Sequence, residues 1–103
     1  MSDKVTWSSY EFQVFSPDNT TWNEVGGIYI FTGVNAQNRW VALYIGQAKA
    51  FSERLPNHER WSEARRLGAT HIHAMVVAKQ ADRDSIEAHL IQVCQPRLNT
   101  QLK

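Results

Sequence analysis

The sequence predicts an α+β domain, a small antiparallel β-sheet with helices packed against it. Runs rich in β-branched and aromatic residues, each bounded by glycine or polar turn residues, predict strands at 28–31, 40–45 and 70–78. Capping residues and charged ends predict helices at 58–67 and 82–94. The chain has 103 residues, 43% of them hydrophobic, so we expect a single domain over 1–103 with one modest core.

The first 25 residues predict one strand and one turn. Apolar and polar side chains alternate over 10–14, which is the period of a half-buried strand. The Ser-Pro-Asp-Asn segment at 16–19 follows, and these residue types favour a turn.

Two β-rich runs predict a hairpin. Gly27 leads into the run at 28–31, and a loop at 33–38 separates that run from the one at 40–45. We expect Tyr29 opposite Tyr44, which centres the hairpin within the loop and sets two phenols side by side. Cross-strand aromatic packing is the alternative explanation for this pair.

Two helical stretches lie between this hairpin and the last strand. Residues 49–55 predict a short helix that Pro56 ends. Asn57 can then cap a helix over 58–67, and Gly68 can end it.

One carboxylate falls on the apolar side of the last helix. Asp82 can cap this helix, which runs to Cys94, and on a helical wheel Glu87 lies inside the apolar arc. A carboxylate that faces a core is costly unless it is paired or bound to a metal. Pairing with Arg83, or a capping box formed with Asp84, would also explain Glu87.

A cluster of residues of the types that bind phosphate follows Tyr44. Lys49, Arg54 and His58 lie close together in the sequence, and an uninterrupted helix would align the last two. Arginine is the natural clamp for a phosphate, and histidine handles protons near neutral pH. A solvated helix face of mixed charge is the alternative explanation.

Composition excludes several classes of protein. The sequence has no apolar run of transmembrane length and no apolar signal-peptide core at its start, and the single Cys94 fits a reducing cytoplasm. The net charge of +1 argues by itself against a generic nucleic-acid binder. Residues 1–26 hold four acidic and one basic side chain, however, and residues 27–103 hold ten basic and six acidic ones. That asymmetry permits a phosphate-binding face.

Six elements in order resemble the GIY-YIG nuclease superfamily. The Gly-Ile-Tyr at 27–29 and the Tyr-Ile-Gly at 44–46 are similar to the motif pair that names it. The segment 48–54 resembles the one that ends in the family's essential arginine, here Arg54, and His58 keeps a spacing found in family members. Glu87 matches the metal-binding glutamate, and Pro96-Arg97-Leu98-Asn99 resembles the segment that ends in a site asparagine.

The resemblance covers about residues 26–100, which we expect to form the nuclease-like core. Residues 30–43, between the two tyrosines, are a longer spacer than is usual in the family, and a hairpin tip can absorb the insertion. Residues 1–25 match none of the motifs, and we expect this N-terminal extension to add an edge strand and to add Trp7 and Trp22 to the core.

The family cleaves phosphodiesters with one divalent metal ion, Mg²⁺ or Mn²⁺, so the resemblance implies a metal-dependent endonuclease. It implies that Glu87 binds the metal and that Arg54 stabilises the phosphate. Tyr29 would activate or position the attacking water, Tyr44 would position water or phosphate, and His58 would assist proton transfer or contact the phosphate. Asn99 would hold the site together by hydrogen bonds.

The implied substrate is nucleic acid, with DNA expected. The basic residues expected to contact it are Lys49, Arg60, Arg65, Arg66 and Arg97. A chain of this size has room for a nuclease core and little else, so target specificity would come from the core, from a homodimer or from a partner protein.

Three other functions remain open from the sequence. The first is a nucleic-acid-binding module of the same fold that is catalytically silent. The second is a zinc enzyme, since His71 and His73 share one strand face, although no clear further ligands are present. Otherwise these histidines would lie on the exposed side of the strand or line a substrate groove. The third is a protein-interaction domain with Trp40 and Trp61 in its contact patch.

Overall fold

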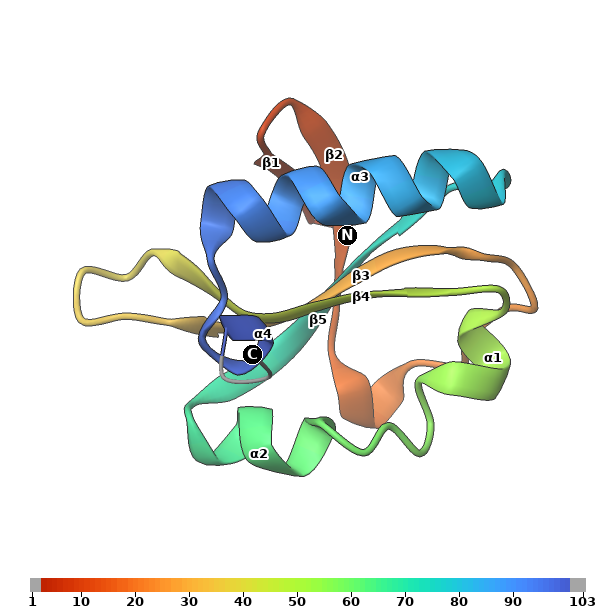
Figure 1. Cartoon of the computed structure of the whole chain (residues 1–103). Coiled ribbons are helices and arrows are strands. Elements are labelled where there is room, and N and C mark those ends of the chain that lie inside the picture. The colour runs from red at the N-terminus through yellow and green to blue at the C-terminus, as the bar shows by residue number, and fades with distance from the viewer. Residues whose placement is uncertain (1–2, 101–103) are drawn as a thin grey trace.

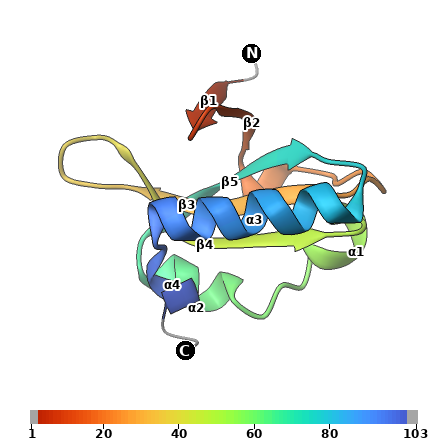
Figure 2. The same cartoon turned by 45° about the horizontal axis from the view of Figure 1, so that its top comes forward.

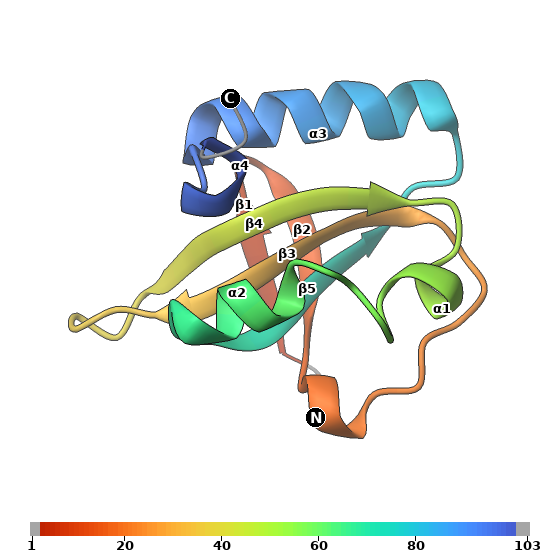
Figure 3. The ribbon, with the colours of Figure 1, turned by 60° about the horizontal axis from the view of Figure 1, so that its bottom comes forward.

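The structure, a computed structural model, describes residues 3–100. Five antiparallel strands form one sheet in the order β1-β2-β5-β3-β4 (Figure 1). Helix α3 lies across one face of this sheet, and α1 and α2 lie against the other (Figure 3). None of the helices in the described range is long and apolar enough to cross a membrane.

The N-terminal strands form a tight hairpin. β1 (Lys4–Trp7) pairs with β2 (Tyr10–Phe15) through a two-residue turn in which Ser8 and Ser9 both have positive φ. Such a turn matches the twist of the strands it joins. The alternation over 10–14 predicts β2, but β1 was not predicted from sequence. A 3₁₀ helix, η1 (Pro17–Asn19), occupies the predicted turn.

β3 (Gly27–Val34) and β4 (Trp40–Ala48) form a long hairpin at one side of the sheet, and its tip projects beyond the rest of the sheet (Figure 2). The predicted register is wrong by two residues: Tyr29 pairs with Gly46, and Phe31 pairs with Tyr44. A bulge between Phe31 and Thr32 adds one residue to the β4 side and accounts for one of the two. The other arises because Val34 pairs with Trp40, which centres the tip on Gln37 instead of between Ala36 and Gln37.

The next elements are α1 (Phe51–Arg54), α2 (Trp61–Arg66) and β5 (Ala69–Val76). The prediction that Asn57 caps α2 is wrong, because the helix begins later and its N-cap residue is Arg60. Gly68 does follow the helix, with φ of 107°, a conformation that side-chain-bearing residues avoid.

The last helices are α3 (Gln80–Cys94) and α4 (Arg97–Thr100). Asp82 lies in the first turn of α3 instead of capping it, since the N-cap residue is Lys79. The apolar arc is also narrower than the wheel predicts, because Val93 is 57% exposed. α4 packs against β4.

Two apolar clusters lie on the two faces of the sheet. The α3 face holds the cluster of Phe12, Ile28, Ile30, Ala42, Ile45 and Leu90. The opposite face holds the larger cluster, which includes Tyr29, Phe31, Phe51, Leu55, Ile72 and Leu98. Trp7 packs against the first cluster and Trp22 against the second, as expected of the N-terminal extension.

His73 is fully buried, contrary to both positions expected of it. Its Nδ1 accepts a hydrogen bond from Trp7 Nε1 at 3.0 Å, and its ring centroid lies 4.5 Å from that of Trp40. Residues 3–100 contain no group of three His, Cys, Asp or Glu side chains placed to hold a metal ion. His71 and His73 therefore lack the companion ligands that zinc requires.

Candidate active site

Tyr29 lies at the centre of the predicted site residues. It is 1% exposed, and its ring lies over Gly46, the residue opposite it on β4. A Cβ atom at position 46 would collide with the phenol oxygen of Tyr29. Glycine at this position therefore allows Tyr29 to extend its hydroxyl to the edge of the sheet.

His58 is the hydrogen-bond partner of Tyr29. Its Nε2 lies 2.6 Å from Tyr29 Oη, while its Nδ1 accepts the backbone N–H of Arg60 at 3.0 Å. Burial, with the Arg54 charge nearby, lowers the pKa of His58 to about 4, so the ring is neutral at pH 7. A neutral imidazole carries one proton, and the accepting Nδ1 leaves that proton on Nε2. The Nε2–H of His58 therefore donates to Tyr29 Oη.

Tyr44 completes an aromatic group with these two residues. Its ring centroid lies 5.3 Å from that of His58 and 6.3 Å from that of Tyr29. Burial is the main cause that raises the pKa of both phenols above the ordinary value of 10. Both tyrosines are therefore protonated at neutral pH in the described structure.

Arg54, the last residue of α1, forms a two-pronged ion pair with Glu59. Its Nη1 and Nη2 atoms donate to the two carboxylate oxygens of Glu59, each at 2.7 Å. These hydrogen bonds from Arg54 are the main cause that lowers the pKa of Glu59 to about 2. The Arg54 side chain is 36% exposed and that of Glu59 is 65% exposed, so solvent reaches both partners.

Arg54 and His58 do not share a helix, because α1 ends at Arg54. The chain turns at Pro56 and brings His58 under the sheet, where it is 6% exposed. The predicted alignment of Arg54 and His58 on one helix is therefore wrong. The Arg54 side chain is 36% exposed, whereas His58 contacts Tyr29.

Glu87 extends from α3 toward β4 and is half-buried. Its Oε1 accepts a hydrogen bond from Nε2 of Gln47 at 2.9 Å, and the same nitrogen donates to Asp84 Oδ1 at 2.8 Å. Arg83 is directed elsewhere, toward the carbonyl oxygens of Val77 and Ala78. α3 begins at Gln80, so Asp84 and Glu87 lie too far along it to form a capping box. Neither alternative explanation for Glu87 therefore holds.

Asn99 joins α4 to the middle of β4. Its Oδ1 accepts the backbone N–H of Ile45 at 2.8 Å, and its Nδ2 donates to the carbonyl oxygen of Ile45 at 2.9 Å. Ile45 stands between Tyr44 and Gly46, so Asn99 fixes the strand at the point where the site residues meet.

A hollow of about 290 Å³ lies between the end of β4 and α1. Gln47, the partner of Glu87, lines it together with Arg54. The other residues that line it are Ala48, Lys49, Ala50 and Glu53. Arg54 and Lys49 bring positive charge to this hollow, Glu53 brings one negative charge, and Gln47 connects it to Glu87.

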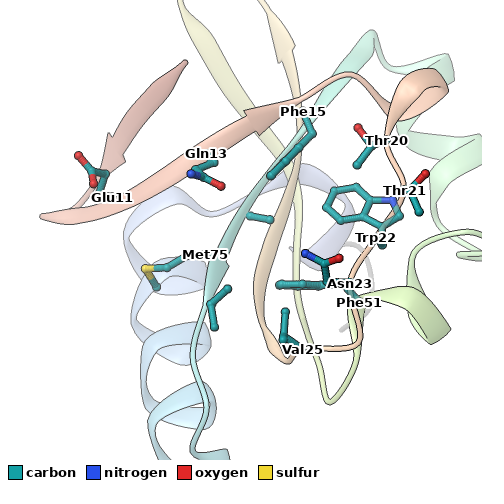
Figure 4. Close-up of a pocket in the computed structure, with 12 residues that line it drawn as sticks. Glu11, Gln13, Phe15, Thr20, Thr21, Trp22, Asn23, Val25, Phe51 and Met75 are labelled. Atoms are coloured by element: carbon teal, nitrogen blue, oxygen red, sulfur yellow. The ribbon is translucent and has the colours of Figure 1, made fainter. Parts of the chain in front are cut away.

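A second hollow, of about 340 Å³, lies between β2, β5 and the segment after η1 (Figure 4). Phe15 and Trp22 line it with the amides of Gln13 and Asn23, and Glu11 is its one charged lining residue. None of its lining residues is a cation that could offset the repulsion between Glu11 and a phosphate, so this hollow is a poor candidate for phosphodiester chemistry.

Comparison with known proteins identifies the family. No family model matches the chain. The chain is 33% identical over 84 residues to the UvrABC system protein C of Thermotoga maritima, a match that covers 78% of this chain and 14% of that protein. A solved structure of the GIY-YIG N-terminal endonuclease domain of that UvrC shares 30% identity and a TM-score of 0.60, covering 74% of this chain and 83% of that domain. The chain belongs to the GIY-YIG nuclease family.

The fold predicted from sequence is confirmed by this match. A second structure of the same UvrC domain gives a TM-score of 0.57. The two neighbours are point mutants, one with an asparagine replaced by alanine and one with a tyrosine replaced by phenylalanine, and each is bound to its catalytic divalent cation. The chain spans about a seventh of the whole UvrC protein.

The donor set of this GIY-YIG chain fits a hard divalent cation held by few protein ligands. Glu87 accepts from a neutral amide, and none of the ion pairs among residues 3–100 includes it. Mg²⁺ binds in such sites through one or two carboxylates, while water and substrate phosphate fill the remaining positions.

The basic residues predicted to contact nucleic acid lie around the helices on the Tyr29 face. Lys49 lines the hollow beside Arg54, and Arg60 pairs with Glu63 at 2.6 Å. Arg65 and Arg66 are exposed at the end of α2, and Arg97 is exposed at the start of α4. Their contact with nucleic acid stays a prediction.

Two residues of the site were not predicted from the sequence. Glu59 was not predicted because the turn at Pro56 brings it back to Arg54, whereas helical spacing favours His58. Gln47 directly follows the Tyr-Ile-Gly motif, and its position one residue beyond Gly46 is the signal that could have identified it.

Proposed function

We propose that this GIY-YIG chain is a metal-dependent endonuclease that hydrolyses phosphodiester bonds in DNA. The observation that carries the proposal is the hollow at the end of β4, because Arg54 lines it together with Gln47, and the Gln47 amide holds the Glu87 carboxylate without neutralising it. A phosphodiester in this hollow would have the Arg54 guanidinium on one side and, beyond Gln47, the Glu87 carboxylate on the other. Hydrolysis would use the first to stabilise charge on the phosphate oxygens and the second to hold a metal ion.

Arg54 is the proposed phosphate ligand. Its two terminal nitrogens already bind a pair of oxygens in the arrangement that a phosphate offers. In the complex, two nonbridging oxygens of the scissile phosphate would take the place of the Glu59 carboxylate. The guanidinium would then stabilise the charge that builds up on these oxygens during hydrolysis.

Glu87 is the proposed metal ligand, for Mg²⁺ or Mn²⁺. A bound divalent cation polarises the phosphoryl group and stabilises the leaving oxygen. Glu87 would bind through the carboxylate oxygen that Gln47 leaves free. The divalent cation in the two UvrC structures supports this role at the level of the family.

Tyr29 is proposed to position the attacking water. Burial raises its pKa, so the phenol is a weak base at neutral pH, and positioning suits it better than proton abstraction. The Nε2–H of His58 occupies one acceptor site on Tyr29 Oη and thereby directs the hydroxyl proton and the other lone pair. Tyr44 would orient water or phosphate beside it.

The remaining residues would hold the site and the substrate. Asn99 keeps β4 in place through Ile45, and the cationic side chains would bind phosphates along the strand. These are Lys49, Arg60, Arg65, Arg66 and Arg97. Selection of a target would fall to the small core, to a homodimer or to a partner protein.

The test is a cleavage panel run on the wild type and on Glu87→Ala in parallel. Duplex, branched and single-stranded DNA and RNA are incubated with Mg²⁺ or Mn²⁺. We expect the wild type to cleave DNA and Glu87→Ala to lose about 10³-fold in rate, which corresponds to the several kcal/mol a metal ion contributes.

Binding separates this proposal from a catalytically silent module. Glu87→Ala should retain salt-dependent DNA binding, because the cationic residues supply that affinity. A wild-type protein that binds DNA and cleaves none of the panel would contradict the nuclease proposal and favour the silent module.

A further inference from the structure

Gln47 links the metal-binding side of the site to a chain of hydrogen bonds. Its Nε2 donates both protons, one to Glu87 at 2.9 Å and one to Asp84 at 2.8 Å. Its Oε1 accepts from Gln80 Nε2 at 2.7 Å, and the same Gln80 nitrogen donates to Asp84 at 2.8 Å. Two amides therefore hold two carboxylates, and Glu87 is the last member of the chain.

The direction of this chain is set at its other end by Arg83. Arginine can only donate, so the Gln80 oxygen must face the Arg83 Nη2, which lies 3.0 Å away. The Gln80 nitrogen is then turned toward Gln47, and it can meet only an oxygen there. That fixes the Gln47 oxygen toward Gln80 and leaves the Gln47 nitrogen for Glu87.

Arg83 is itself firmly anchored. It is 6% exposed, and its Nη1 donates to the carbonyl oxygens of Val77 and Ala78 at 2.9 Å each. The guanidinium is therefore locked in the segment that joins β5 to α3. Because Arg83 can only donate hydrogen bonds, it fixes the orientation of the Gln80 amide and, through it, of the Gln47 amide. Arg83 itself makes no contact with Glu87 in this chain of hydrogen bonds.

A hydrogen bond from a neutral amide orients a carboxylate without cancelling its charge. One oxygen of Glu87 is occupied by Gln47, and the side chain loses rotational freedom, while the full negative charge stays available to a cation. Partners of this kind commonly contribute a factor of 10–100 to metal affinity.

We propose that Gln47 is the positioning residue for Glu87, with the polarity of its amide set by Arg83 through Gln80. This inference rests on the proposed function, since it assumes that Glu87 binds a divalent cation. Gln47, Gln80 and Arg83 lie outside the motifs on which the resemblance to the family rests.

The experiment measures Mn²⁺ affinity directly, without cleavage, by water-proton relaxation on the full chain. We expect Gln47→Ala to weaken Mn²⁺ binding by about tenfold or more and Gln80→Ala to weaken it by less, because the amide of Gln47 then keeps its donor but loses its fixed direction. Gln92→Ala is the matched control, because Gln92 is an exposed glutamine of α3, the helix that carries Gln80 and Glu87. This variant should bind Mn²⁺ as the wild type does.

DNA affinity in the absence of metal provides the second readout. Gln80→Ala, at a residue that does not line the hollow beside Arg54, should leave it unchanged, whereas a distorted site would lower it, and circular dichroism checks the fold of each variant. Mn²⁺ affinity that is unchanged or increased in Gln47→Ala, while Glu87→Ala abolishes binding, would overturn the inference and leave the proposed function intact. Wild-type Mn²⁺ binding by Glu87→Ala would instead remove the metal role of Glu87, and with it the proposed function.

Discussion

The two charged groups of the site, Arg54 and Glu87, are held in opposite ways. Arg54 is paired with a formal negative charge, because Glu59 binds both of its terminal nitrogens. Glu87 is held by a neutral amide from Gln47, and no cation opposes it among the described ion pairs of residues 3–100. The cation of the site is neutralised, whereas the anion is not.

This difference fits the partners that each group is proposed to receive. A phosphate can displace a carboxylate from arginine because it offers two oxygens in the same geometry. The ion pair with Glu59 therefore keeps the Arg54 guanidinium oriented for a phosphate. A metal ion needs a carboxylate that is oriented and fully charged, and an ion pair would weaken that. In this proposal Glu59 holds Arg54 in the geometry that a phosphate needs, and Gln47 holds Glu87 in the orientation that a metal ion needs.

The largest effect that would test this contrast is the removal of Arg54. Arg54→Ala should lower the cleavage rate about 10²–10³-fold, the usual loss when one group that stabilises transition-state charge is removed. Arg54→Lys should recover little of it, because an ammonium cannot bind two oxygens side by side. Single-turnover kinetics on a DNA substrate measure both variants, and full activity in Arg54→Lys would contradict the role of the two-pronged geometry.

Acid should destabilise the Tyr29 side of the site. The folded state lowers the pKa of His58, and of His73 elsewhere, to about 4 from an ordinary value of 6.5. Between these values the unfolded chain binds more protons than the folded chain, so the stabilisation present above pH 6.5 is lost as pH falls toward 4. Each histidine contributes at most about 3 kcal/mol to this loss.

Denaturant unfolding at pH 7 and at pH 4.5 measures this loss. Replacing His58 or His73 by glutamine should flatten the dependence of unfolding free energy on pH, even where it lowers stability at pH 7. A wild-type free energy that stays constant across this range would show that neither ring is kept neutral by the fold.

The smallest expected effect comes from Glu59, and it tests whether this carboxylate occupies the proposed phosphate position on Arg54. Glu59→Gln removes the competitor from Arg54, so DNA affinity should rise about two- to fivefold, the scale of an exposed ion pair. Glu11→Gln is the matched control, since it removes an equal charge from the pair with Lys4, which is not among the proposed DNA contacts. Fluorescence anisotropy in a Glu87→Ala background measures binding without cleavage. Equal gains in both variants would reduce the effect to net charge, and weaker binding in Glu59→Gln would make Glu59 a support for Arg54 instead.

Much of the fold could be predicted from local sequence signals, and the errors share one cause. The runs at 28–31 and 40–45 and the stop at Gly68 depend on neighbouring residues, and they were identified. The register of Tyr29 and the cap at Asn57 failed because a bulge and a turn, neither visible in hydrophobic periodicity, decide them. The first strand was not predicted although Lys4–Trp7 alternates polar and apolar residues, because a pattern of only four residues is too short to stand out.

The site was predictable where a residue violates a pattern and unpredictable where it obeys one. Glu87 was singled out because a carboxylate within an apolar arc demands an explanation, and the resemblance to the nuclease family then made it the predicted metal ligand. Gln47 and Glu59 look like ordinary surface residues, and only folding brings them to Glu87 and Arg54. Polar side chains that act through contacts made by distant parts of the chain leave no periodic signal.

The Asn99 amide has a consequence beyond the active site. β4 is the last strand of the sheet, and the outward backbone groups of such a strand can recruit a strand from another molecule. Asn99 occupies the N–H and the C=O of Ile45 as a neighbouring strand would, with a single side chain. Asn99 thereby also blocks this position against edge-to-edge aggregation, so the chain can keep an open sheet edge beside the proposed site.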